Sequence, residues 1–139
     1  MLDMIRRYSR RLGLFSAAVL LLSSCGAPGP ITATLKDFSF QLSSNTAKAG
    51  NVTFKITNSG TVKHEFVVEQ TDLTPDKLPM TADGSVDEEK LTSMGEQGDI
   101  EVGNTVDLTL VMHPGHYVII CNLPTHFQQG MHTEFTVTP

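Results

Sequence analysis

Beyond residue 30, apolar and polar side chains alternate with a period of two over most of the chain. Such alternation is typical of half-buried β-strands, whereas an amphipathic helix repeats its apolar residues about every 3.6 positions. Glycine, proline and asparagine interrupt the alternating segments and favour turns there. The pattern therefore predicts an all-β chain. The alternating segments are 31–35, 38–42, 52–57, 64–69, 105–110, 116–121 and 133–137.

About seven short strands separated by turns favour an antiparallel β-sandwich. Residues 71–103 break the pattern, because they hold most of the acidic side chains and little alternation. We expect a long, acidic, partly helical insertion here, with a helical turn or two at 86–91. Long loops are often functional or mobile, although a solvated insertion is the plainer interpretation. Residues 83–87 resemble a calcium loop only faintly, since they lack its regular ligand order.

The first 24 residues have a different composition from the rest. Four arginines lie within residues 1–11, and an apolar run of eleven residues follows at 12–22. A basic start and a short apolar centre are typical of a secretory signal. The run is too short to span a bilayer, which needs about 20 residues. We therefore assign residues 1–24 to a signal peptide.

The sequence Leu-Ser-Ser-Cys at 22–25 resembles the cleavage site of bacterial lipoproteins. This resemblance implies that Cys25 becomes the lipid-modified N-terminus, that 25–30 form a short tether and that 31–139 form the folded domain. An ordinary signal peptide followed by a cysteine is the alternative. Residues 9–14 also resemble a twin-arginine export signal, so the export route stays open.

Cleavage would make the chain more acidic. Loss of 1–24 removes four of the ten basic residues and one of the fifteen acidic ones, so the formal net charge falls from −5 to −8. Such a surface repels phosphate backbones, which argues against nucleic acid as a partner. It would instead attract a basic partner.

The two cysteines have different expected roles. If Cys25 is lipidated, Cys121 has no disulfide partner. A lone thiol in an exported protein needs an explanation, because oxidising compartments favour pairing. A bond to a metal ion is one explanation. The alternative, a disulfide between Cys25 and Cys121, would remove both the lipid anchor and the metal site.

Candidate metal ligands lie in the last nineteen residues, where Cys121, His126 and Met131 follow one another at Cys-x4-His-x4-Met spacing. His64 lies far upstream on a predicted strand. Two histidines, a cysteine and a weak axial methionine are the ligand set of blue-copper electron-transfer sites. Taken singly, each has a plainer interpretation as a structural histidine, an inert buried cysteine or a core methionine.

Two segments resemble the cupredoxin family. Residues 114–131, Pro-Gly-His-Tyr-Val-Ile-Ile-Cys-Asn-Leu-Pro-Thr-His-Phe-Gln-Gln-Gly-Met, are similar to its signature, and 58–66 are similar to the segment with its first histidine. The Cys–His spacing resembles that of rusticyanin, sulfocyanin and auracyanin rather than plastocyanin. The resemblance implies a Greek-key β-sandwich, electron transfer and one type 1 copper ion. The implied ligands are His64, Cys121, His126 and Met131.

One departure from the family concerns Glu65, where many cupredoxins carry an asparagine that links the two ligand loops. An ionised carboxylate cannot donate a hydrogen bond as an amide does. Hydrogen bonds around the ligands tune such sites, so the potential of relatives cannot be transferred. We interpret His113, His116 and His132 as surface residues, with a weak second metal site at His113 and His116 as an alternative.

These features predict an exported, membrane-anchored carrier of single electrons, not an enzyme. The resemblance places His126 near an apolar surface patch, to which Pro114, Leu123, Pro124 and Phe127 are the candidate contributors. The expected partner is a redox protein, such as a cytochrome-like domain, with a basic docking surface. Lipid at Cys25 would hold the protein to the outer face of the cytoplasmic membrane or the periplasmic side of an outer membrane.

Three other functions remain as alternatives. A copper carrier could deliver the ion to a membrane oxidase, although Met80, Met94 and Met112 are scattered rather than clustered. A copper enzyme would need an open coordination position or a second copper cluster, and the sequence has no His-x-His pair for one. A metal-free interaction domain predicts that replacing Cys121 leaves function intact.

Overall fold

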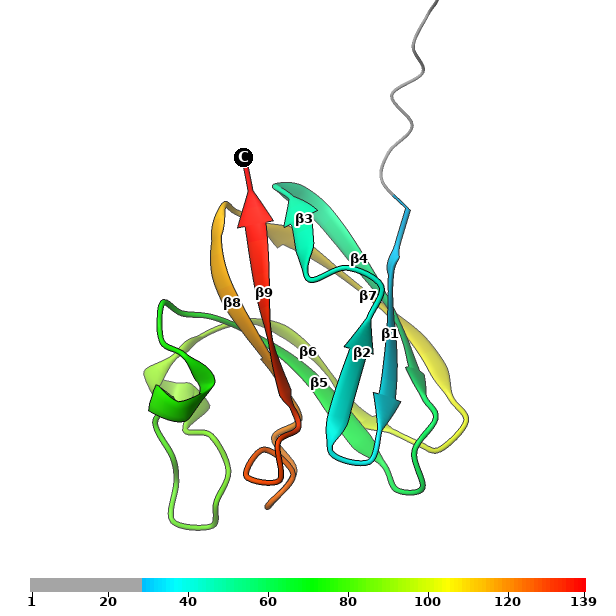
Figure 1. Ribbon diagram of the computed structural model, residues 1–139, viewed down its shortest axis with the longest axis vertical. Coiled ribbons are helices and arrows are strands. Elements are labelled where there is room, and N and C mark those ends of the chain that lie inside the picture. Colours follow the sequence, from blue (N-terminus) through cyan, green and yellow to red (C-terminus); the bar gives the residue numbers. More distant parts are fainter. Residues whose placement is uncertain (1–28) are drawn as a thin grey trace, which may run out of the picture.

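The computed structural model describes residues 29–139, which form a sandwich of two β-sheets (Figure 1). One sheet has the order β2-β1-β4-β7 and the other the order β3-β9-β8-β5-β6. The predicted all-β sandwich is confirmed. The strands are β1 (Ile31–Lys36), β2 (Ser39–Leu42), β3 (Thr46–Lys48), β4 (Gly50–Asn58), β5 (His64–Gln70), β6 (Thr92–Ile100), β7 (Thr105–Met112), β8 (Gly115–Ile120) and β9 (His132–Thr138).

The predicted signal peptide at 1–24 and the predicted lipidation site Cys25 lie outside the described residues. Within 29–139, no helix is long and apolar enough to cross a membrane.

Both sheets are mixed, so two strand pairs depart from the antiparallel arrangement that the sequence predicted. β1 runs parallel to β4, and β3 runs parallel to β9, whereas the other pairs are antiparallel. The chain leaves the first sheet after β2, forms β3 in the second sheet and returns as β4 alongside β1. Alternation with a period of two shows which face of a strand is buried but not the direction of its neighbour. The pairing of β4 with β7 and of β5 with β8 joins strands distant in sequence, as in Greek-key folds.

The main core fills the space between the two sheets. Phe54 of β4 lies at its centre, with its ring 5.2 Å from that of Phe66 on β5 and 5.4 Å from that of Phe135 on β9. All three rings are buried. These aromatic contacts join the first sheet to the second and fix their separation, because large rings contribute most of the apolar burial.

The expected insertion at 71–103 contains more strand and less helix than the sequence predicted. Its last third forms β6, and its helical content is limited to two short 3-10 helices, Pro75–Lys77 and Glu88–Lys90. β6 has few apolar residues, and its pairing with β5 contains two register shifts. A polar, bulged edge strand shows little alternation, which explains why the pattern did not predict it.

Residues 71–91 cover the outer face of the second sheet, at the lower left of Figure 1. They supply Leu78 and Val86 to a second buried cluster with Val67 of β5 and Ile120 of β8. β5 and β8 are consequently buried on both faces, which explains the nearly continuous apolar run that ends at Cys121.

Three connections meet at one end of the sandwich, the lower end in Figure 1. They are the β1–β2 turn, the β4–β5 loop and the segment that joins β8 to β9. The β7–β8 turn lies at the opposite end. The candidate ligands therefore gather at the first end, where the chain enters β5 and leaves β8.

Candidate metal centre

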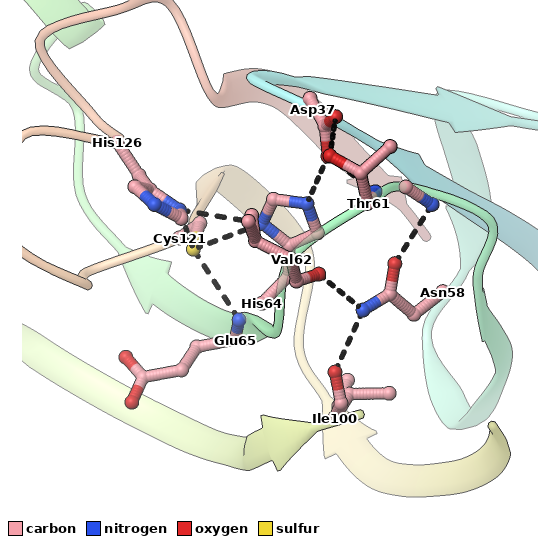
Figure 2. Close-up of polar contacts among 10 residues, drawn as sticks. Asp37, Asn58, Thr61, Val62, His64, Glu65, Ile100, Cys121 and His126 are labelled. Atoms are coloured by element: carbon pink, nitrogen blue, oxygen red, sulfur yellow. Dashed lines mark hydrogen bonds and ion pairs between the residues drawn. The ribbon is translucent and has the colours of Figure 1, made fainter. Parts of the chain in front are cut away.

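His64, Cys121 and His126 come together at this end of the sandwich (Figure 2). His64 opens β5, Cys121 directly follows β8, and His126 lies in the turn-rich segment beyond it. The Nδ1 atoms of the two histidines are 3.3 Å apart, and Cys121 Sγ lies 3.9 Å from His64 Nδ1 and 3.3 Å from His126 Nδ1. This is the only group of three or more His, Cys, Asp or Glu side chains with metal-site spacing among residues 29–139.

The size of this triangle fits a metal ion. A point equidistant from the three donor atoms lies about 2 Å from each of them, close to metal–imidazole bonds of about 2.0–2.1 Å and metal–thiolate bonds of about 2.3 Å. Two imidazoles and one thiolate in a trigonal arrangement are the donors that type 1 copper sites use. The residues present therefore fit a copper ion in chemistry and in spacing.

Met131 is placed next to the other candidate ligands by backbone hydrogen bonds. The Cys121 N–H donates to the Met131 carbonyl and the Met131 N–H to the His126 carbonyl, each at 3.1 Å. The Met131 side chain is fully buried. Gly130 has a φ of +101°, a conformation that residues with a side chain rarely adopt. This bend directs the chain from the His126 turn back to Met131.

His64 is oriented by a residue that the sequence analysis did not identify. Its Nε2 lies 3.3 Å from Asp37 Oδ1 in the β1–β2 turn. Asp37 also accepts hydrogen bonds from the Thr61 hydroxyl and N–H, and these bonds lower the pKa of its carboxyl to about 2. Aspartate is common in turns for local reasons, so nothing in the sequence distinguished Asp37.

The loop before His64 is shaped by Asn58, a buried polar residue whose role the sequence did not reveal. Its side-chain amide donates to the carbonyls of Val62 and Ile100 at 2.8 and 2.7 Å, and its oxygen accepts from the Gly60 N–H at 2.9 Å. The side-chain NH2 group of Asn58 therefore donates two hydrogen bonds and the side-chain oxygen accepts one. Figure 2 shows Asn58 and Asp37 holding the loop from its two sides.

The sulfur of Cys121 accepts a hydrogen bond from the backbone of β5, the strand that begins at His64. The backbone N–H of Glu65 lies 3.3 Å from Cys121 Sγ. The backbone thus provides a link between the two ligand segments, and Figure 2 shows the Glu65 carboxylate extending away from the sulfur. Burial raises the pKa of the Cys121 thiol, so metal binding must displace a proton.

His126 is the most exposed of the three clustered residues, and burial together with nearby His64 lowers its pKa. Pro124 is exposed and Leu123 half-buried beside it in the sequence. The ring of Phe38, which the sequence analysis did not include, meets His126 edge-on at 5.3 Å. The apolar surroundings of His126 are thus drawn partly from the β1–β2 turn.

Two residues expected in this surface patch lie elsewhere. Pro114 precedes β8 at the end of the strand remote from Cys121, because the whole of β8 separates them. Phe127 is only 8% exposed, packs in the second buried cluster and stacks on His132 at 5.0 Å. Position in the sequence did not show that the side chain directly after His126 points inward.

The remaining histidines lie outside the cluster. His113 is exposed, whereas His132 is half-buried against Phe127. His116 uses both ring nitrogens, with Nδ1 2.6 Å from the Thr71 carbonyl and Nε2 3.4 Å from Glu134. Neither nitrogen of His116 is left to form a site with His113.

The chain is similar to known copper proteins over most of its length. Residues 40–139 match the family model described as the sulfocyanin (SoxE) domain. Reduced auracyanin from Roseiflexus castenholzii has a TM-score of 0.61 at 20% identity, over 82% of this chain and 100% of that one. Rusticyanin from Thiobacillus ferrooxidans has a TM-score of 0.58 at 21% identity, over 78% and 75%.

A "blue" copper protein, auracyanin A from Chloroflexus aurantiacus, has a TM-score of 0.53 at 20% identity, over 79% of this chain and 100% of that one. No curated protein matches the sequence. At these identities the solved structures show a shared fold, and the family match covers both segments that carry the candidate ligands.

Proposed function

This chain belongs to the sulfocyanin (SoxE) domain family of cupredoxins, and from that membership we propose that it is an exported, lipid-anchored carrier of single electrons. The cofactor is one type 1 copper ion. The proposed ligands are His64, Cys121, His126 and Met131.

The observation that carries this proposal is the triangle formed by two Nδ1 atoms and one Sγ, with sides of 3.3–3.9 Å. Without a role as a metal ligand, the imidazole of His64 would gain little from burial beside Cys121, since it is a polar group removed from water. Bound copper supplies a one-electron couple, and thiolate together with thioether favours its reduced form.

The protein's part is to hold the ligands in one arrangement and to exclude water. Cys121, His64 and Met131 are fully buried. The Glu65 N–H holds the sulfur, and Asp37 holds the far side of His64. A frame that does not rearrange between two oxidation states keeps the barrier to electron transfer low, because preorganised groups need no reorganisation at the moment of reaction.

Electrons are proposed to enter and leave at His126, through its partly exposed edge and the apolar rim made by Phe38, Leu123 and Pro124. Redox encounters are small and short-lived, so a modest apolar rim suffices. The net negative charge supports a partner with a basic docking surface, such as a cytochrome-like domain. Lipid at Cys25 would confine this search to the outer face of the cytoplasmic membrane or the periplasmic side of an outer membrane.

Retention of copper separates electron transfer from copper delivery. The copper-loaded chain would be reduced by ascorbate and oxidised by ferricyanide through many cycles, in the presence of a copper-free acceptor protein. The proposal predicts that the copper stays with this chain throughout. Loss of the ion to the acceptor within the first reductions would support delivery instead.

Lipid anchoring has its own test. The full chain is expected to fractionate with membranes when expressed in a bacterium that processes lipoproteins, and Cys25→Ser is expected to release it. Equal membrane association of the two forms would contradict anchoring at Cys25.

A further inference from the structure

We infer that Asp37 is a positioning residue of the copper centre, and that its carboxylate holds His64 in the tautomer and orientation that direct Nδ1 at the metal. The inference rests on the proposed copper site. It concerns a residue of the β1–β2 turn that is 27 positions away from His64 in the sequence.

The contact is part of a built network. Asp37 Oδ1 accepts from His64 Nε2 at 3.3 Å and from the Thr61 N–H at 2.8 Å, while Oδ2 accepts from the Thr61 hydroxyl at 2.6 Å. Both oxygens are therefore fixed by one residue of the β4–β5 loop. A carboxylate fixed in this way cannot rotate out of reach of His64 without losing two charge-assisted hydrogen bonds.

Gly60 provides the space for this contact. A Cβ on Gly60 would lie 2.4 Å from Asp37 Oδ1 and 2.9 Å from His64 Nε2, which no ordinary packing allows. The φ of Gly60 is not in the left-handed region, so the glycine is required for space rather than for its backbone conformation. Any other residue at this position would wedge the carboxylate and the imidazole apart.

The next residue of the same turn contacts the second histidine. Phe38 has a φ of +61°, which is uncommon for an aromatic residue, and its ring meets His126 edge-on at 5.3 Å. Strained backbone persists where the surrounding structure determines it, often at functional sites. Two consecutive turn residues, Asp37 and Phe38, thus hold the outer sides of both candidate copper histidines.

The chemical consequence follows from the tautomer. When Nε2 of His64 donates its proton to Asp37, Nδ1 carries a free lone pair that faces Cys121. A carboxylate that accepts a hydrogen bond from Nε2 also makes Nδ1 more basic and therefore a stronger metal ligand. The negative charge favours the more highly charged ion, so Asp37 stabilises bound Cu(II) more than bound Cu(I).

The test compares Asp37→Asn with Asp76→Asn in the complete mature protein. Asp76 accepts a hydrogen bond from the Thr74 hydroxyl much as Asp37 does from Thr61, but it lies in the first 3-10 helix. The two variants lose the same charge. We expect the ratio of Cu(II) to Cu(I) affinity to fall about tenfold in Asp37→Asn, which raises the reduction potential by about 59 mV. Asp76→Asn should leave the ratio unchanged.

Two further measurements test the contact between Asp37 and His64 independently of the potential. In the metal-free protein, ¹⁵N NMR should show His64 as the Nε2–H tautomer, and an Nδ1–H tautomer would overturn the inference. Gly60→Ala should weaken Cu(II) binding about tenfold or more, whereas Gly98→Ala, where a Cβ meets only Glu65 Oε1 at 3.9 Å, should not.

The outcomes separate the two proposals. A wild-type protein that binds no copper through Cys121 would refute the proposed function, and the NMR tautomer would still test the Asp37 contact. A wild-type protein with a normal copper site, but with equal potentials in Asp37→Asn and Asp76→Asn, would overturn the inference alone.

Discussion

β5 carries two fully buried polar side chains, His64 and Glu69, which differ in whether they have hydrogen-bond partners. His64 has a partner at each ring nitrogen, Asp37 at Nε2 and the ligand cluster at Nδ1. Neither carboxylate oxygen of Glu69 has a hydrogen-bond partner among residues 29–139. The same strand thus presents one satisfied polar group at the end of the sandwich and one unsatisfied group beneath the insertion.

The comparison shows that burial affects the two residues in different ways. Burial raises the pKa of Glu69 to about 7, helped by the neighbouring carboxylates of Glu88 and Glu96. Ser93, opposite Glu69 in the strand register, acts in the other direction and lowers this pKa only in part. An unpaired buried carboxyl is costly to ionise. His64 should therefore matter mainly for metal binding, and Glu69 mainly for the pH dependence of stability.

The largest effect is expected at His64. His64→Ala removes an imidazole that binds the metal. Cu(II) affinity should therefore fall by more than the roughly 100-fold that is typical when a residue hydrogen-bonded to a metal ligand is lost. Competition titration with a copper chelator measures this directly. His113→Ala, which removes an exposed histidine, is the matched control. Equal affinities in the two variants would remove His64 from the ligand set.

Glu69→Gln tests the other half of the comparison. Because the folded carboxyl keeps its proton up to about pH 7 and the unfolded one only to about 4.5, wild-type stability should fall as pH rises between these values. Gln cannot ionise, so the variant should be about 3 kcal/mol more stable than wild type at pH 8 and similar to it below pH 4.5.

Urea unfolding at pH 4.5, 6 and 8 measures this difference, with exposed Glu89→Gln as the control. The copper band of Glu69→Gln should match that of the wild type. A stability difference between Glu69→Gln and the wild type that is the same at pH 4.5, 6 and 8 would show that Glu69 is ionised and solvated in the folded protein.

A smaller effect is expected at Asn122, which joins the two regions. Its side chain bonds the N–H and C=O of Val86 at 2.6 and 3.0 Å and the Glu88 carboxylate at 2.5 Å, directly after Cys121. Asn122→Ala should loosen the insertion, cost about 1–2 kcal/mol of stability and admit water to Glu69. The pH dependence of its unfolding should be weaker than in the wild type; an unchanged profile would mean that the insertion stays closed without Asn122.

Sequence reasoning identified the parts of this protein whose chemistry or periodicity is unusual. The alternating strands and the Cys121, His126 and Met131 spacing were visible because they are regular. Asp37 and Asn58 were not, since an Asp or Asn in a turn is ordinary and only the fold brings them to the site. Phe127 and Pro114 were misplaced for the same reason: neighbours in sequence need not share a surface.

The most direct test of the account is the visible absorption and EPR spectrum of residues 26–139 after addition of one equivalent of Cu(II). A thiolate–copper site predicts an intense visible band that disappears on reduction and is absent from Cys121→Ala. A colourless protein, or a band that persists without the Cys121 sulfur, would contradict the copper site and with it the proposal of electron transfer.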